Sequence, residues 1–212
     1  MKFIFIGDIH GKVHKVEEAL ALDGHKVFVG DFMDSYDRSD SDHAKCLDLV
    51  IEAAKKEEAT VLYGNHELSY IMPERHRCSG YRPYLDSNVI PAYLPDIQKY
   101  FKPFFEPAED WLVTHAGLHP EVAMQLSENW GQEFIDPSSA LHWIGRYRGG
   151  LNPVGGIFWC DFNMEFELIE GLNQVFGHTR QRNGIQKREA PNSVNYCIDV
   201  LDMKHEFLTL DL

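Results

Sequence analysis

The stretch FIFIGDIHG, residues 3–11, decides the fold of this chain. Its first half is a short apolar run, which is typical of a strand buried on both faces. Its second half is a turn bounded by Gly7 and Gly11 that carries a carboxylate, Asp8, and an imidazole, His10. Open α/β sheets build their sites at the carboxyl ends of such strands. The stretch therefore predicts one half of a metal site.

Four further blocks repeat this arrangement along the chain. Each follows an apolar, strand-like run, and the blocks are GD at 30–31, GNHE at 64–67, THAG at 114–117 and GHT at 177–179. One block alone would say little, because a lone histidine at a strand end is more often a hydrogen-bonded surface or core residue. Five blocks in order make a dinuclear metal hydrolase the leading interpretation.

The polar side chains of these blocks match the needs of two divalent ions. First-row divalent metals take carboxylate oxygen and imidazole nitrogen as ligands, and two ions about 3.5–4 Å apart need a bridging carboxylate. The six candidate ligands are Asp8 and His10 for a first ion, Asp31 as the bridge, and Asn65, His115 and His178 for a second ion.

The order of the predicted elements favours an α/β fold. Strands at 2–6, 27–29 and 60–63 alternate with helices at 13–22 and 42–56, which predicts a parallel sheet with right-handed crossovers. Further along, we expect strands at 111–114, 155–159 and 174–176, helices at 66–72, 121–126 and 139–147, and an antiparallel pair at 194–200 and 205–210. The chain is expected to be a single domain, residues 1–212, with a mixed sheet or two packed sheets flanked by helices.

Residues 73–107 interrupt this alternation. They are rich in Pro, Tyr and Arg, with one helical stretch near 90–101. We interpret them as an insertion over the strand ends, where a lid or specificity element would lie. A plain packing excursion is the alternative.

Composition limits the classes of partner. The 212 residues include 20 basic and 33 acidic ones, and the net charge of −13 argues against an extended nucleic-acid groove. A phosphate ester remains compatible, because divalent ions would add positive charge at the site. No apolar stretch approaches the ~20 residues that span a bilayer. We expect no signal peptide and no membrane partner, and the four widely spaced cysteines fit free thiols. The expected location is the cytoplasm.

The five blocks resemble those of the calcineurin-like metallophosphoesterases, and within that superfamily the phosphoprotein phosphatases of bacteriophage and bacterial type. The blocks GDIHG, GDFMD, GNHE, THAG and GHT match in order and cover most of the chain. The resemblance implies a four-layer fold, a two-sheet sandwich flanked by helices, with two metals at its edge. These are commonly manganese, with iron, zinc, nickel and magnesium as alternatives. The resemblance implies the same ligand roles as those given above.

A mechanism follows from the resemblance. A hydroxide that bridges the two metals attacks phosphorus, and the leaving oxygen then needs a proton. We expect His66, next to Asn65, to give that proton. Asp34 is similar to the family's partner for that histidine and is expected to orient it. For Glu67 we expect a structural hydrogen-bonding role.

Two positions depart from the family's pattern. The phosphoprotein phosphatases place Arg-Gly after the second Asp of the GDFMD block, whereas this chain has Ser35 there and Arg38 three residues later. Arg38 is a candidate phosphate ligand, with a surface role as the alternative. A second arginine would be Arg146 or Arg148, and the sequence does not choose between them. Arg180 stands where many nucleases of the superfamily carry a second histidine, which weakens the nuclease interpretation.

The leading function is therefore hydrolysis of phosphate monoesters, including phosphoserine or phosphothreonine in proteins. One alternative is a hydrolase of dinucleoside polyphosphates such as diadenosine tetraphosphate, which shares these blocks. A nuclease or cyclic-nucleotide phosphodiesterase is another, and a metal-free scaffold is a third. The presence of all six candidate ligands and the candidate acid argues against the scaffold.

Overall fold

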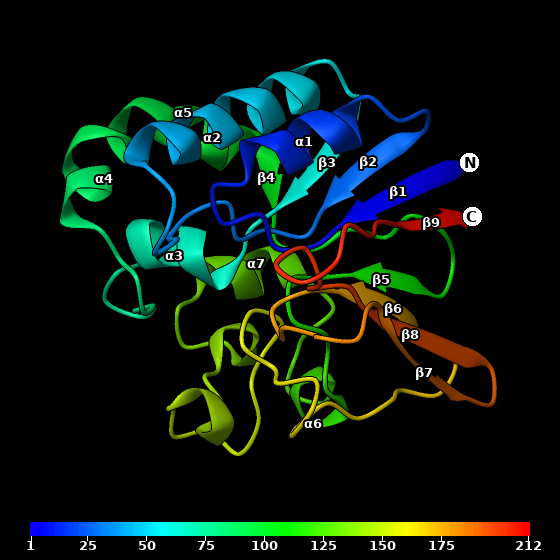
Figure 1. Ribbon diagram of the computed structural model, residues 1–212. Coiled ribbons are helices and arrows are strands. Elements are labelled where there is room, and N and C mark those ends of the chain that lie inside the picture. The colour runs from blue at the N-terminus through cyan, green and yellow to red at the C-terminus, as the bar shows by residue number, and fades with distance from the viewer. The chain divides into compact units, whose positions relative to one another are not determined.

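The computed structural model describes residues 1–212 and divides them into two compact units. Unit 1 comprises residues 1–102 and 207–212, and unit 2 comprises residues 103–206. Each unit contains one mixed sheet with helices from the same unit (Figure 1). The predicted α/β class and the presence of two sheets with helices are thereby confirmed. The assignment of residues 1–212 to a single domain stays a prediction.

The sheet of unit 1 is built around the opening strand, β1 (Lys2–Ile6). It pairs in parallel with β2 (His25–Phe28), β2 with β3 (Ala59–Leu62) and β3 with β4 (Phe101–Lys102), while β9 (Leu208–Asp211) lies antiparallel to β1. Residues 3–6 are all buried, which explains why this strand has an uninterrupted apolar sequence. The carboxyl ends of β1, β2 and β3 point to the same edge of the sheet, because the three strands are parallel.

Five helices belong to unit 1: α1 (Val13–Leu20), α2 (Asp40–Lys55), α3 (Asn65–Ile71), α4 (Pro83–Asn88) and α5 (Ile90–Tyr100). Figure 1 shows α1, α2 and α5 on one face of the sheet. Helix α2 begins two residues earlier than predicted because Ser39 caps it. The Ser39 hydroxyl accepts the Asp42 N–H, and the Asp42 carboxylate accepts the Ser39 N–H at 2.9 Å.

Unit 2 has a four-stranded sheet in the order β5-β6-β8-β7. β5 pairs in parallel with β6 and β6 with β8, while β7 is antiparallel to β8. Its elements are β5 (Trp111–Val113), α6 (Pro120–Ala123), α7 (Trp130–Ile135), the 3₁₀ turns η1 (Ala140–His142) and η2 (Arg146–Arg148), β6 (Asn173–Phe176), β7 (Gln186–Ala190) and β8 (Ser193–Cys197). A buried cluster that includes Phe162, Phe166 and Phe176 forms part of its core.

Several predictions for unit 2 and the C-terminus are wrong. Residues 155–159 form a turn, because the N–H groups of Trp159 and Cys160 both bond to the Gly156 carbonyl. Residues 139–147 hold two short 3₁₀ turns in place of one helix. The two last strands do not pair with each other, since β8 pairs with β7 and β9 joins the sheet of unit 1. Strand β7 is absent from the prediction because its sequence, QKREA, has no apolar face.

The predicted insertion, residues 73–107, contains α4, α5 and β4, and the boundary between the units falls inside it. Arg82 ties this segment to the rest of unit 1. Its guanidinium donates to Asp40 Oδ1 at 2.6 Å and to the Arg38 carbonyl at 3.1 Å. A role as a lid stays a prediction. No helix in the chain combines the length and the apolar character needed to cross a membrane.

Candidate active site

The loops that follow β1 and β2 are hydrogen-bonded to each other in unit 1. The N–H groups of Ile9 and His10 donate to the Asp31 carbonyl at 3.0 and 2.8 Å, and Gly11 N–H donates to the Phe32 carbonyl at 3.0 Å. The loop after β3 packs against the loop after β2. Gly30 in the β2 loop has a φ of +105°, and a Cβ there would lie 2.4 Å from the Gly64 nitrogen in the β3 loop. Only glycine allows this approach.

Glu67 fixes the loop after β2 to the loop after β3. One of its oxygens accepts N–H bonds from Phe32 at 2.8 Å and Met33 at 3.2 Å, and the other accepts them from Asp31 at 2.8 Å and Gly64 at 3.0 Å. Burial and the Asp31 charge raise the pKa of Glu67, while these four donors favour its charged form. The structural role predicted for Glu67 matches this position.

Three of the predicted site residues in unit 1 have a left-handed backbone. His10 has a φ of 44°, Asp31 of 56° and Asp34 of 58°. Such conformations are uncommon for residues other than glycine and cost about 1–3 kcal/mol each when the surroundings do not support them. The surrounding hydrogen bonds hold these loops in place, and strain of this kind is concentrated at functional sites.

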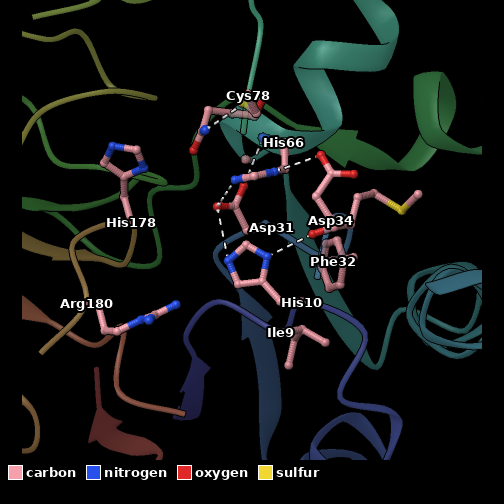
Figure 2. Close-up of polar contacts among 12 residues, drawn as sticks. Ile9, His10, Asp31, Phe32, Asp34, His66, Cys78, His178 and Arg180 are labelled. Atoms are coloured by element: carbon pink, nitrogen blue, oxygen red, sulfur yellow. Dashed lines mark hydrogen bonds and ion pairs between the residues drawn. The ribbon is translucent and has the colours of Figure 1, made fainter. Parts of the chain in front are cut away.

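His10, Asp31 and His66 form a group that could hold a metal ion. One ligand atom from each lies within 4.8 Å of the others. His10 Nε2 is 3.8 Å and His66 Nε2 is 3.9 Å from Asp31 Oδ2, and Figure 2 shows both rings turned toward this carboxylate. Asp8 is buried just after β1, two residues before His10.

The protonation of His10 suits a metal ligand. Its Nδ1–H donates to the Met33 carbonyl at 2.8 Å, so that Nε2 carries the lone pair. Burial lowers the pKa of His10 to about 4, against the opposing effect of the Asp31 charge, and the ring is neutral at pH 7. An imidazole lone pair beside a carboxylate is a donor set that first-row divalent metals accept. These residues therefore fit the divalent metal that the sequence implies.

His66 and Asp34 are hydrogen-bonded, as the sequence suggested. His66 Nδ1 donates to Asp34 Oδ2 at 2.8 Å (Figure 2), and the His66 backbone N–H donates to Asp31 Oδ1 at 3.0 Å. Burial alone would lower the pKa of His66, but the negative charges of Asp31 and Asp34 outweigh it and raise that pKa. The second oxygen of Asp34 accepts the hydroxyl of Tyr70. The pair is thus a carboxylate-held imidazole that tends to carry a proton.

Asn65 has a partner that the sequence did not reveal, Cys78. The Asn65 amide Nδ2–H donates to Cys78 Sγ at 3.0 Å, and the thiol donates to the Asn65 carbonyl at 3.1 Å. This contact decides which end of the amide faces Cys78 and turns Oδ1, the candidate ligand atom, away from it. The thiol stays protonated, because burial raises the pKa of Cys78.

The two candidate ligands of unit 2 lie side by side. His115 Nε2 and His178 Nδ1 are 3.2 Å apart, and both residues are buried. The Gly177 N–H donates to the His115 carbonyl at 2.7 Å, which joins the ends of β5 and β6. His178 also has a left-handed backbone, with a φ of 63°.

The candidate phosphate-binding arginines differ in their surroundings. Arg148 lies near His178: its guanidinium contacts Asp161 Oδ2 at 3.0 Å, Thr179 Oγ1 at 2.8 Å and the His178 carbonyl at 3.5 Å. Arg146 is exposed. In unit 1, Arg38 packs against Gly11, where a Cβ would lie 2.9 Å from the Arg38 Cβ. The assignment of all three to phosphate binding stays a prediction.

Sequence reasoning missed Tyr70 and Cys78 as neighbours of the site. Tyr70 lies four residues after His66, one helical turn along α3, and this spacing is a signal that could have found it. Cys78 lies in an irregular segment whose path depends on tertiary contacts, and no local pattern marks it.

Comparison with known proteins places these features in a family. The sequence profile described as calcineurin-like phosphoesterase matches residues 1–181. No curated protein sequence gives a match. Among solved structures, a mutant cold-active protein tyrosine phosphatase aligns over 99% of this chain and 75% of its own, with 16% identity and a TM-score of 0.66. Another structure of a cold-active protein tyrosine phosphatase aligns over 99% and 73%, with 16% identity and a TM-score of 0.62.

The structural likeness shows a shared fold, and the profile match shows the family. The match covers most of the chain and includes the five blocks from GDIHG to GHT. The chain therefore belongs to the calcineurin-like phosphoesterase family and is a hydrolase that acts on phosphoric esters.

Proposed function

We propose that this chain hydrolyses phosphate monoesters with the help of two divalent metal ions. The observation that carries the proposal is the His66–Asp34 pair, which lies beside His10 and Asp31, two residues that could ligate a metal ion. A monoester needs a proton on its leaving oxygen when that oxygen is an alkoxide, and a carboxylate-held imidazole supplies one. The substrate class includes phosphoserine and phosphothreonine side chains.

The proposed ligands come from the order of the blocks together with the local geometry. The six proposed ligands are Asp8, His10, Asp31, Asn65, His115 and His178. Divalent ions held there would polarise the phosphoryl oxygens and lower the pKa of a bound water. Oxygen and imidazole nitrogen ligands suit manganese, while iron, zinc, nickel and magnesium are the competing ions.

The residues of the chain hold and move the proton. His66 Nδ1–H stays with Asp34, and a proton on Nε2 passes to the leaving oxygen of the ester. Asp34 keeps its charge throughout and stabilises the imidazolium form, as its contact with Nδ1 allows. The Asp31 backbone carbonyl accepts the His10 N–H, and the Asp31 carboxylate accepts the His66 N–H. These two bonds hold the loops after β1 and β3, so the backbone that carries the His66 ring is fixed.

Substrate oxygens would be held by arginine. A guanidinium matches two phosphoryl oxygens at once. Arg148 is the better candidate of the Arg146–Arg148 pair, because its guanidinium lies within 3.5 Å of the His178 carbonyl. The four cysteines are free thiols, which supports a reducing compartment such as the cytoplasm.

The test is an assay of the purified chain with manganese against four substrates. These are p-nitrophenyl phosphate, its bis ester, a phosphoserine peptide and diadenosine tetraphosphate. We expect the two monoesters to have the highest kcat/KM, and Asp31→Asn to abolish all activity. A higher kcat/KM for the bis ester or for diadenosine tetraphosphate would contradict the proposal.

A further inference from the structure

We propose that Tyr70 is a positioning residue that holds Asp34, and through it His66, in the geometry for proton donation. This inference rests on the proposed function. Tyr70 lies on α3, one turn after His66, and its side chain is buried. Neither the GNHE block nor any other motif of the sequence includes it.

The Asp34 carboxylate has one donor on each oxygen. Oδ2 accepts His66 Nδ1–H at 2.8 Å, and Oδ1 accepts the Tyr70 hydroxyl. The Asp34 side chain is buried, so an oxygen that lost its donor would have little water to replace it. Burial and the nearby Asp34 charge raise the pKa of Tyr70, and the phenol therefore keeps the proton that it donates.

Tyr70 is itself held by the segment 78–82. The Arg82 backbone N–H donates to the Tyr70 oxygen at 3.1 Å, and the ring of Tyr81 stacks on that of Tyr70 with centroids 5.0 Å apart and an interplanar angle of 25°. The Arg82 guanidinium is fixed in turn by Asp40 at 2.6 Å. A continuous set of contacts thus runs from the segment 78–82 to the candidate acid.

The chemical consequence depends on the leaving group. When His66 donates its proton, the leaving oxygen gains an O–H bond and His66 Nε2 loses its N–H bond, while Asp34 remains a carboxylate. A basic leaving oxygen needs this proton during bond cleavage, whereas p-nitrophenolate leaves readily without it. Loose positioning of the acid should therefore slow the hydrolysis of esters of basic alcohols and phenols more than the hydrolysis of p-nitrophenyl phosphate.

The experiment compares Tyr70→Phe with wild type on phenyl phosphate and p-nitrophenyl phosphate, with manganese present. We expect kcat on phenyl phosphate to fall about tenfold, since one hydrogen bond to a buried charged group is lost. On p-nitrophenyl phosphate we expect less than about a threefold fall, with KM nearly unchanged on both. The matched control is Tyr93→Phe, which removes a tyrosine hydroxyl bonded to Asp48 at 2.8 Å on the surface and should leave both rates unchanged. Equal losses on the two esters, or no loss, would overturn the inference.

A second readout separates this inference from the proposed function. Proton NMR in ¹⁵N-labelled protein should show a slowly exchanging His66 Nδ1–H, assigned by its disappearance in His66→Asn. We expect that signal to shift or broaden in Tyr70→Phe and to stay unchanged in Tyr93→Phe. An unchanged signal in Tyr70→Phe would contradict the positioning role even if neither ester were a substrate. Failure of wild type to hydrolyse either ester, with the expected NMR change, would contradict the proposed function alone.

Discussion

The candidate histidines of unit 1 and unit 2 differ in how their ring nitrogens are bonded. In unit 1, each imidazole has one nitrogen bonded to a fixed acceptor: His10 to the Met33 carbonyl and His66 to the Asp34 carboxylate. In unit 2, His115 and His178 are bonded to each other at 3.2 Å. A hydrogen bond between two imidazoles needs a lone pair on one of them, so at least one ring is neutral. Unit 1 therefore fixes which nitrogen of each candidate ring carries a proton, and it contains both a candidate ligand, His10, and the candidate acid, His66. Both candidate histidines of unit 2 are expected ligands.

Both units use a buried glutamate to hold their loops. Glu67 accepts four backbone N–H groups in unit 1, and Glu165 accepts those of Tyr147, Gly155 and Asp161 in unit 2 at 3.0–3.3 Å. The loop held by Glu67 carries Asp31, a candidate bridging ligand. In unit 1 the buried glutamate therefore directly bonds the backbone of a candidate metal ligand.

The largest expected effect is on turnover, from His66→Asn. The substitution removes the proton donor, and kcat should fall about 10²–10⁴-fold on a phosphoserine peptide. His25→Asn is the matched control, because His25 bonds to Thr60 on the β2–β3 pair, away from the Asp34 carboxylate. Steady-state kinetics measure both. A kcat of His66→Asn within a few-fold of wild type would mean that unit 1 does not supply the acid.

Next in size is the effect of Glu67→Gln on stability. The amide of glutamine would place an NH₂ group against backbone N–H donors, so we expect the free energy of unfolding to fall by about 3 kcal/mol. Glu165→Gln should lower the free energy of unfolding by about 2 kcal/mol, because Glu165 accepts three backbone N–H groups and Glu67 accepts four. Urea denaturation followed by tryptophan fluorescence measures both. Only Glu67→Gln should also weaken manganese binding, and equal weakening in the two variants would remove the contrast between the units.

A smaller effect is expected on substrate affinity from Arg148→Met. Loss of a guanidinium contact to phosphoryl oxygens should raise KM for p-nitrophenyl phosphate about tenfold. Arg146→Met should change KM less than about twofold, because this side chain is exposed. The reverse ranking would assign phosphate binding to Arg146.

The smallest effect is expected from Cys78→Ala. The Cys78 sulfur accepts from the Asn65 side-chain amide, and the thiol donates to the Asn65 backbone carbonyl. Loss of these two weak contacts should lower manganese affinity, measured by calorimetry, about threefold. Cys46→Ala, which trims a buried side chain of α2, should lower stability and leave that affinity unchanged. Unchanged affinity in both variants would exclude Cys78 as a support of Asn65.

The parts of the fold that follow local patterns were predictable. β1 is a fully apolar run and α2 has a regular apolar face, so both are recognisable without tertiary context. The pairing of β9 with β1 was not, because residues 208–211 alternate between half-buried and exposed positions and would suit either sheet. The turn at residues 155–159 is apolar because it is buried, which imitates a strand.

The candidate site also has a part that was predictable from the sequence and a part that was not. Asp31, His66 and Asp34 stand in blocks whose glycines and spacing are visible in the sequence, and the structure brings them together. Tyr70 and Cys78 contact the site through tertiary structure alone. Their positions follow from the course of the segment 78–82, which no periodicity describes.

The most direct test of the contrast between the units is the metal content of three proteins, wild type, His66→Asn and His178→Asn, measured by elemental analysis after dialysis against manganese. We predict two ions per chain in wild type and in His66→Asn, because we assign His66 to proton donation and not to metal ligation. We predict one ion per chain in His178→Asn. Loss of an ion in His66→Asn, or two ions in His178→Asn, would contradict the assignment of proton donation to His66 and of metal ligation to His178.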